Sequence, residues 1–167
     1  MYDYTFSYGA FTTSVLVGQT WNAMHNAWGH KLAKMGLTSE QASILWFCSY
    51  CPGPLTPAEI ARRLFRKSQT ITELLARMER DGLIRRVPKQ KGHPFTEVQI
   101  TAEGEKRLRP ARKVMLASAV NFESSLSAEE IEQLQKLLRK VRQKALKEQH
   151  AKLTPPPGYA LGEVIAI

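Results

Sequence analysis

Residues 68 to 81 carry the clearest periodic pattern in the chain. Apolar residues recur there at three- and four-residue intervals, which places on one helical face Ile71, Leu74, Leu75 and Met78. Polar side chains fill the other face. Ser68 is a natural N-cap, because its hydroxyl can accept a hydrogen bond from a free N–H of the first turn. The pattern predicts an amphipathic helix that ends at Asp81-Gly82.

Two short apolar segments follow this helix and predict a β-hairpin. The first begins at Leu83, and the second includes Val98 and Ile100. Between them lies a basic tip, residues 89–94, that contains glycine and proline. A helix followed by a basic hairpin is the plan of a winged helix-turn-helix, although the combination also occurs in other α+β domains.

Capping residues predict two further helices upstream. Thr38 with Gln41 three residues later forms a capping box, and so does Thr56 with Glu59. The second of these helices, from Pro57 to about residue 65, is followed within three residues by the helix that begins near residue 68. Two short helices joined so closely form a helix-turn-helix, in which the second helix presents its polar N-terminal face.

Long amphipathic helices are predicted at both ends of the chain, over about residues 14–35, 102–126 and 128–145. Pro110 lies inside the second of them. It is expected to kink or interrupt the helix, because proline removes one backbone hydrogen bond and crowds the preceding turn. The apolar faces of these helices exceed what a small winged domain can cover. We therefore expect a homodimer in which the first helix and the last two interlock.

The expected fold is mainly α with a small β-hairpin, a winged helix-turn-helix flanked by long N- and C-terminal dimerisation helices. The expected divisions are an aromatic arm with the first dimerisation helix (1–37), the winged helix-turn-helix (38–101), the C-terminal dimerisation helices (102–153) and a Pro-rich apolar tail (154–167).

Composition and charge narrow the possible partners. With 43% hydrophobic residues the chain is not disordered, and no apolar run approaches the roughly 20 residues that span a bilayer. We expect a cytoplasmic protein without a membrane partner. The net charge is +9, and residues 61–113 hold fifteen Lys or Arg and six Asp or Glu, whereas the remainder holds nine of each sign. An excess confined to the predicted helices and hairpin is typical of a phosphate-binding surface.

Catalysis and cofactor binding find little support in the sequence. The four His are scattered, no His, Cys and Glu group has metal-ligand spacing, and no Gly-rich phosphate loop is present. We expect no enzyme, no cofactor and no metal. Cys48 and Cys51 have the spacing of a thiol redox switch. Cys48 lies on an apolar helix, however, and neither cysteine has a basic neighbour in sequence, which favours structural thiols.

Four segments resemble the MarR family of transcriptional regulators: LTSEQASILW, LTPAEIARRL, ITELLARMERDGLIRRVP and VQITAEGEKRL. The most specific feature is DGLIRR followed about 14 residues later by ITAEG. The resemblance covers about residues 13–148. It implies a homodimer that binds an inverted-repeat operator in double-stranded DNA, a repressor released by a small aromatic or phenolic effector. The family commonly carries an Asp and an Arg two apart at the wing tip, where this chain has Gly92 and Pro94.

Candidate DNA contacts follow from placing the helix after residue 68 in the major groove. Its N-terminal residues reach base edges first: Gln69 can pair with adenine, and Thr70 and Thr72 can meet a thymine methyl group. Arg77 suits a phosphate or a base edge, and for Ser68 the cap is the favoured role. The remaining candidates are basic residues that grip the DNA backbone beside the turn or on the wing: Arg62, Arg66, Lys67, Arg86, Lys89, Lys91 and His93.

A set of mainly aromatic residues is either core and dimer interface, the favoured interpretation, or an effector pocket: Trp21, His25, Trp28, Trp46, Tyr50 and Met115. His25 lies one turn from two of the tryptophans and could hold an acidic effector, although an interface histidine is the favoured alternative. Two other functions stay open. One is a thiol-redox-responsive regulator of the same fold, and the other is a winged-helix module that binds RNA or a protein partner.

Overall fold

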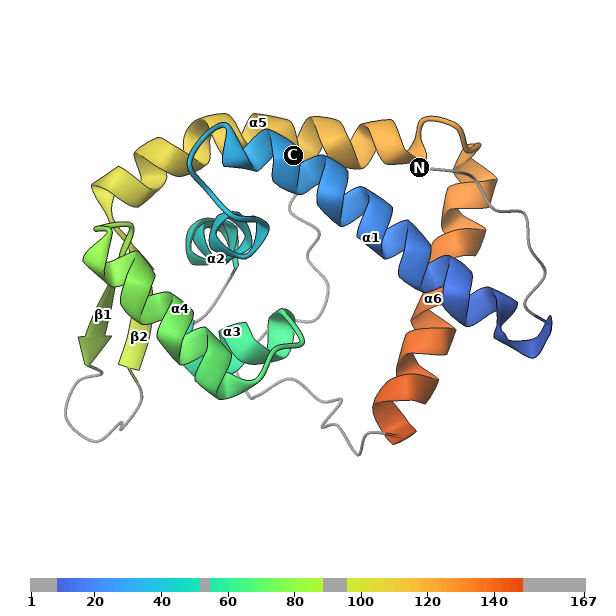
Figure 1. Ribbon diagram of the computed structural model, residues 1–167, viewed down its shortest axis with the longest axis horizontal. Helices are drawn as coiled ribbons and strands as arrows, with labels where there is room; N and C mark the ends of the chain where they lie inside the picture. The colour runs from blue at the N-terminus through green and yellow to red at the C-terminus, as the bar shows by residue number, and fades with distance from the viewer. Residues whose placement is uncertain (1–8, 52–54, 89–95, 149–167) are drawn as a thin grey trace.

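A computed structural model of the chain describes residues 9–51, 55–88 and 96–148 (Figure 1). These residues form six α-helices and one two-stranded antiparallel sheet, which confirms the predicted mainly helical fold with a hairpin. After a 3-10 turn at Gly9–Phe11 the elements are α1 (Thr12–Ala33), α2 (Ser39–Tyr50), α3 (Pro57–Arg63), α4 (Ser68–Arg80), β1 (Ile84–Pro88), β2 (Thr96–Ile100), α5 (Ala102–Glu123) and α6 (Ala128–Glu148). None of these helices is long and apolar enough to cross a membrane. Most of the predicted aromatic arm and all of the apolar tail lie outside the described residues.

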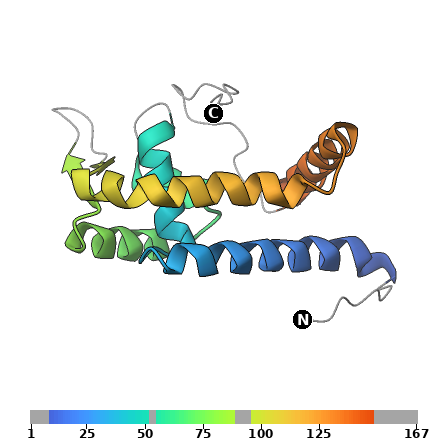
Figure 2. The same ribbon diagram turned by 90° about the horizontal axis from the view of Figure 1, so that it is seen from above.

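Two long helices frame the molecule. α1 and α5 lie side by side and run in opposite directions in both Figure 1 and Figure 2. α2 crosses them, α4 and the hairpin lie at the end of the molecule away from α6, and α3 lies nearer the middle, between α4 and α6 (Figure 1). The core forms where α2, α3, α4, the hairpin and the first half of α5 meet. Its fully buried side chains include Leu32, Ile44, Leu45, Ile60, Ile71, Leu75, Met78, Ile84, Val98 and Leu108.

Three helices end in the same way. After α1, α3 and α4 the chain enters the left-handed region at Gly36 (φ 69°), Phe65 (φ 52°) and Gly82 (φ 70°). In each case the next N–H donates to the carbonyl five residues back, as Arg66 does to Ala61 at 2.9 Å. This is the Schellman arrangement, in which glycine is favoured because it has no Cβ. Phe65 therefore occupies a strained position in the turn of the helix-turn-helix.

The predicted helix starts are confirmed in part. Thr38 and Gln41 form the full capping box of α2. The Thr56 side chain caps α3, but Glu59 does not complete the box, because its carboxylate binds Arg62 and Arg63 instead. The prediction that Ser68 caps α4 is wrong. Lys67 is the N-cap and makes no side-chain cap bond, while Ser68 is already helical and its carbonyl accepts from Thr72 Oγ1 at 2.9 Å.

Of the two effects expected of Pro110, a kink or an interruption, the interruption does not occur, since α5 is continuous from Ala102 to Glu123. Leu108 and Ala111, on either side of the proline, are 1% and 0% exposed. Packing of these residues against the core stabilises the turn that lacks a hydrogen bond. Tertiary burial thus outweighs the local cost of the proline.

The hairpin is held at its base by backbone contacts. β1 and β2 pair in the register Ile84↔Ile100 to Pro88↔Thr96, and Val98 N donates to Leu55 O at 2.7 Å on the other edge of β2. Thr101 caps α5 and its N–H donates to Leu83 O at 3.2 Å. The start of α5 lies so close to β1 that a Cβ on Gly104 would stand 2.1 Å from the Leu83 carbonyl oxygen.

This contact predicts that Gly104→Ala destabilises the protein by more than about 2 kcal/mol, because a backbone carbonyl cannot move aside as a side chain can. Gly18→Ala in α1 is the matched control, since a Cβ there meets nothing within 4 Å. Alanine should stabilise that helix by about 0.5–1 kcal/mol. Urea unfolding of both variants at equal protein concentration measures the difference, and equal midpoints would contradict the close contact.

Candidate nucleic-acid interface

The outward face of α4 is polar and open. Ile71, Leu75 and Met78 turn into the core at 0% exposure, which leaves on the opposite face Gln69, Thr72, Glu73 and Arg80, all exposed. Gln69 Nε2 donates to Glu73 Oε1 at 3.3 Å, one turn further along. The helix is therefore anchored by one face and free to enter a groove with the other.

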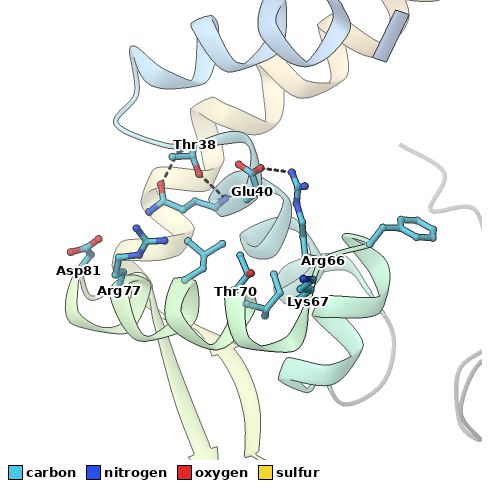
Figure 3. Close-up of a pocket in the computed structure, with 11 residues that line it drawn as sticks. Thr38, Glu40, Arg66, Lys67, Thr70, Arg77 and Asp81 are labelled. Atoms are coloured by element: carbon cyan, nitrogen blue, oxygen red, sulfur yellow. Dashed lines mark hydrogen bonds and ion pairs between the residues drawn. The ribbon is translucent and has the colours of Figure 1, made fainter. Parts of the chain in front are cut away.

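Thr70 and Arg77 lie on a different flank of the same helix. Both line a hollow of about 660 Å³ between α4 and the N-terminal turn of α2, where Thr38 and Glu40 form the facing wall (Figure 3). Lys67 also lines this hollow, which we call the head hollow. Neither Lys67 nor Arg77 makes an ion pair within the part of the chain that the structure describes. The basic side chains at this flank are available to an anion.

Other basic residues near the turn are held by acids. Glu59 is only 6% exposed and binds both Arg62 and Arg63, the latter at 2.9 Å. Glu40 Oε1 accepts from Arg66 Nη2 at 3.1 Å (Figure 3). These pairs fix where the positive charges lie, because a carboxylate and a guanidinium together restrict the side chain of each.

Arg86 on β1 is held in the same way, by a glutamate of α4. Glu79 on α4 accepts from the Arg86 backbone N–H at 2.8 Å and from Arg86 Nε at 2.7 Å. These hydrogen bonds lower the pKa of the Glu79 carboxyl from its usual value. The pair ties β1 to α4 and so sets the direction in which the wing leaves the helix. The other wing candidates, Lys89, Lys91 and His93, lie outside the described residues, as do Gly92 and Pro94.

A second hollow, of about 850 Å³, lies between α1, the turn after α3 and α6, and we call it the helix hollow. Trp21, His25 and Trp28 line it from α1. The rings of Trp21 and His25 are 5.4 Å apart, and His25 Nε2 is 4.0 Å from Glu40 Oε1. Trp28 Nε1 is buried without a hydrogen-bond partner in the described structure.

The other three effector candidates do not line the helix hollow. Trp46 and Tyr50 stack on α2 with ring centres 4.6 Å apart, and both pack against the core, as Met115 does. Arg112 on α5 donates to the Tyr50 hydroxyl at 2.8 Å and lies over its ring. The six predicted residues therefore form two groups, one beside the helix hollow and one between α2 and α5.

The two cysteines are thiols in apolar surroundings. Burial raises the pKa of Cys48 to about 12. Burial also raises the pKa of Cys51, although Arg63 Nη1 contacts its Sγ at 3.0 Å. A thiol with a raised pKa is a poor nucleophile at neutral pH, which agrees with the structural interpretation. Among the described residues no group of three His, Cys, Asp or Glu could hold a metal ion.

Comparison with known proteins decides the family. A model of the MarR family matches residues 35–93. The transcriptional regulator HosA of Escherichia coli is 36% identical over 114 residues, which are 68% of this chain and 82% of HosA. The chain belongs to the MarR family. This MarR-family protein is a DNA-binding transcriptional regulator and not an enzyme.

Solved structures of transcription regulators agree with the fold. The S. aureus MepR–DNA complex is similar with a TM-score of 0.74 and 27% identity, over 81% of this chain and 97% of MepR. The organohalide-sensing regulator RdhR, in its 2,4-dichlorophenol bound form, has a TM-score of 0.70 and 23% identity, over 93% of this chain and 98% of RdhR. At that identity the second comparison supports the fold alone.

In this MarR-family chain, the sequence indicated the basic residues around α4 and the wing but not the acidic residues that bind them. Glu73 lies four residues after Gln69, a spacing that indicates contact on a helix. Glu79 reaches Arg86 across the turn after α4, and Glu40 reaches Arg66 from another helix. No periodic pattern in the sequence signals those two contacts.

We predict that Glu79→Gln and Arg86→Ala each weaken binding to target DNA by up to about fivefold, the effect of losing an exposed ion pair of ~1 kcal/mol. Both changes free the wing from α4. Because the pKa of Glu79 is lowered in the folded state, the pair contributes at neutral pH and is lost as pH falls through that lowered value.

Electrophoretic mobility shifts compare these two variants with Glu148→Gln, which removes an exposed ion pair at the end of α6. If Arg86 served instead as a direct phosphate contact, Glu79→Gln would strengthen binding while Arg86→Ala weakened it. That opposite pair of signs would contradict the wing-anchoring role.

Proposed function

We propose that this regulator is a homodimeric repressor that binds an inverted-repeat operator and is released by a small aromatic or phenolic effector. The observation that carries the proposal is the outward face of α4, which is polar and exposed over its length while the opposite face is fully buried. Such a helix can be inserted into the major groove without moving the core.

Base reading is assigned to the outward face and backbone contact to its flanks. Gln69 and Thr72 face outward in the N-terminal half of α4, the part that reaches base edges first. Thr70 and Arg77 line the head hollow, so Arg77 and Lys67 suit phosphates beside the groove. Ser68, Arg62, Arg66 and the wing residues remain candidates for the same backbone surface.

Dimerisation is supported by the apolar surface of the long helices. α6 has no buried residue among those described. Even its apolar side chains are exposed, with Leu134, Leu137 and Val141 at 44%, 50% and 50%. On α1, Trp21 is 56% exposed. An apolar surface of this extent on two adjacent helices fits a partner subunit. In a dimer of this kind two copies of α4 would reach half-sites about one helical turn of DNA apart.

An effector site is supported by the helix hollow. Its wall combines the rings of Trp21 and Trp28 with His25, whose imidazole offers an N–H donor. A phenolate or carboxylate group is the acceptor that such a donor prefers. The related regulator RdhR has been crystallised with 2,4-dichlorophenol, which is a ligand of this chemical class.

The helix hollow also shares lining residues with the head hollow beside α4. Glu40 and Arg66 line both hollows, and Glu40 Oε1 is close to both His25 and Arg66. Arg66 immediately follows the strained Phe65 in the turn that leads into α4. An anionic ligand beside His25 would change the field at Glu40 and Arg66, which gives release of DNA a physical route.

The test of operator binding is footprinting of the gene's own upstream region with the purified protein. We expect protection of an inverted repeat, with affinity that falls steeply as salt is raised. Gln69→Ala combined with Thr72→Ala should lower operator affinity by about tenfold or more, because base contacts are lost. The same variant should bind random duplex as the wild type does.

Glu132→Ala on α6 is the control and should bind the operator normally. Equal binding of the wild type to operator and random duplex would contradict sequence-specific recognition and leave only a basic module.

For the effector site we predict that His25→Phe weakens binding of 2,4-dichlorophenol or benzoate by about tenfold, because phenylalanine keeps an aromatic ring in the wall of the helix hollow but removes the N–H donor. Ligand-induced release of operator DNA should need correspondingly more ligand. Tryptophan fluorescence measures the affinity, and Trp46→Phe is the matched control since Trp46 does not line the helix hollow. An equal loss in both variants, or in neither, would contradict this site.

A further inference from the structure

Glu73 is an acid on the face of α4 that meets DNA. It is exposed, it makes no ion pair within the described residues, and its hydrogen-bonding neighbour there is Gln69. The other glutamate of α4, Glu79, is turned toward Arg86 and the wing. One carboxylate oxygen of Glu73 therefore remains free at the centre of the reading surface.

A free carboxylate in this place opposes binding to DNA in general. The phosphates of both strands repel it, and no basic side chain of the described residues forms an ion pair with it. The floor of the major groove offers groups that attract a carboxylate, namely the exocyclic amino groups of the bases. Glu73 can thus contribute favourably only when the base beneath it presents such a donor.

The hydrogen bond to Glu73 also orients the amide of Gln69. Because Gln69 Nε2 donates to Glu73 Oε1 at 3.3 Å, the amide oxygen points away from the carboxylate. Gln69 then presents an acceptor and its second N–H, the combination that matches adenine. Glu73 presents only acceptors.

Cytosine fits a group that presents only acceptors better than adenine does. The adenine edge places the N7 acceptor beside its amino group, and N7 would repel the second oxygen of a carboxylate. The cytosine edge carries the amino donor without an adjacent acceptor of its own.

We propose that Glu73 is a specificity-determining residue that accepts a hydrogen bond from the amino group of a cytosine, next to the base that Gln69 reads. This inference rests on the proposed binding of an operator in the major groove. It adds one defined base preference in each half-site and a penalty against all other sequences.

The test is selection of bound duplexes from a randomised library by the full-length protein, followed by sequencing. The variants are Glu73→Gln, Glu73→Ala and, as a control with the same change of charge, Glu132→Gln on α6. We expect the wild type and the control to select cytosine at one position in each half-site. Glu73→Gln should change that preference to adenine, and Glu73→Ala should lose it, with about tenfold less discrimination at that position and the other positions retained.

Three results would overturn the proposal. In the first, both Glu73 variants keep the preferences of the wild type and differ from it only in overall affinity, as the control does. In the second, the wild type selects adenine where the variants change, which would assign the wrong base. In the third, Glu73→Ala loses the preference assigned to Gln69 as well, which would make Glu73 only a support for its neighbour. A wild type that selects no sequence would instead contradict the proposed function. Thermal unfolding of the variants at the temperature of the wild type shows that they are folded.

Discussion

Burial of one face of α4 is the constraint on which the rest of the structure depends. Ile71, Leu75 and Met78 are each 0% exposed, and burying a side chain of this size contributes about 1.5–3 kcal/mol. An exposed ion pair contributes ~1 kcal/mol at most. The apolar contacts therefore decide where the helix lies. The polar contacts decide only how the turn before it and the wing after it are directed.

Three glutamates fix the directions of the turn and the wing by binding arginines around α4. Glu59 holds two arginines of α3, Glu40 holds Arg66 before α4, and Glu79 holds Arg86 after it. The basic side chains of residues 61–113 are consequently not all free to move. Some guanidinium groups are fixed as parts of the scaffold, while Lys67 and Arg77 stay open beside the head hollow. A count of charges along the sequence cannot separate these two kinds of basic residue.

Local signals in the sequence were sufficient for most of the fold. The three- and four-residue spacing of apolar positions predicted α4 and the long helices, capping residues predicted α2 and α3, and the capping box of α2 formed as expected. The failures have one physical origin, competition from partners distant from the local pattern. Glu59 prefers two arginines to the N-cap backbone, and Pro110 is carried by the burial of Leu108 and Ala111. The split of the aromatic set has the same origin. Trp28 lines the helix hollow beside the first turns of α2, whereas Trp46 lies further along α2 with its ring against Tyr50.

Under the proposed function, Glu40 is the residue at which the scaffold and the response to an effector meet. Its Oε1 atom lies 3.1 Å from Arg66 Nη2 and 4.0 Å from His25 Nε2, so one carboxylate oxygen is shared by the two side chains. At such separations a change of one unit charge alters the interaction by about 1 kcal/mol or more even in a watery environment. The turn that receives this change already contains Phe65 in a left-handed conformation. A strained turn beside a shared carboxylate needs little energy to rearrange, and α4 begins immediately after it. The contacts of Glu40 contribute little to the position of α4 in the core. They lie, however, where a change in charge would alter how α4 is presented to DNA.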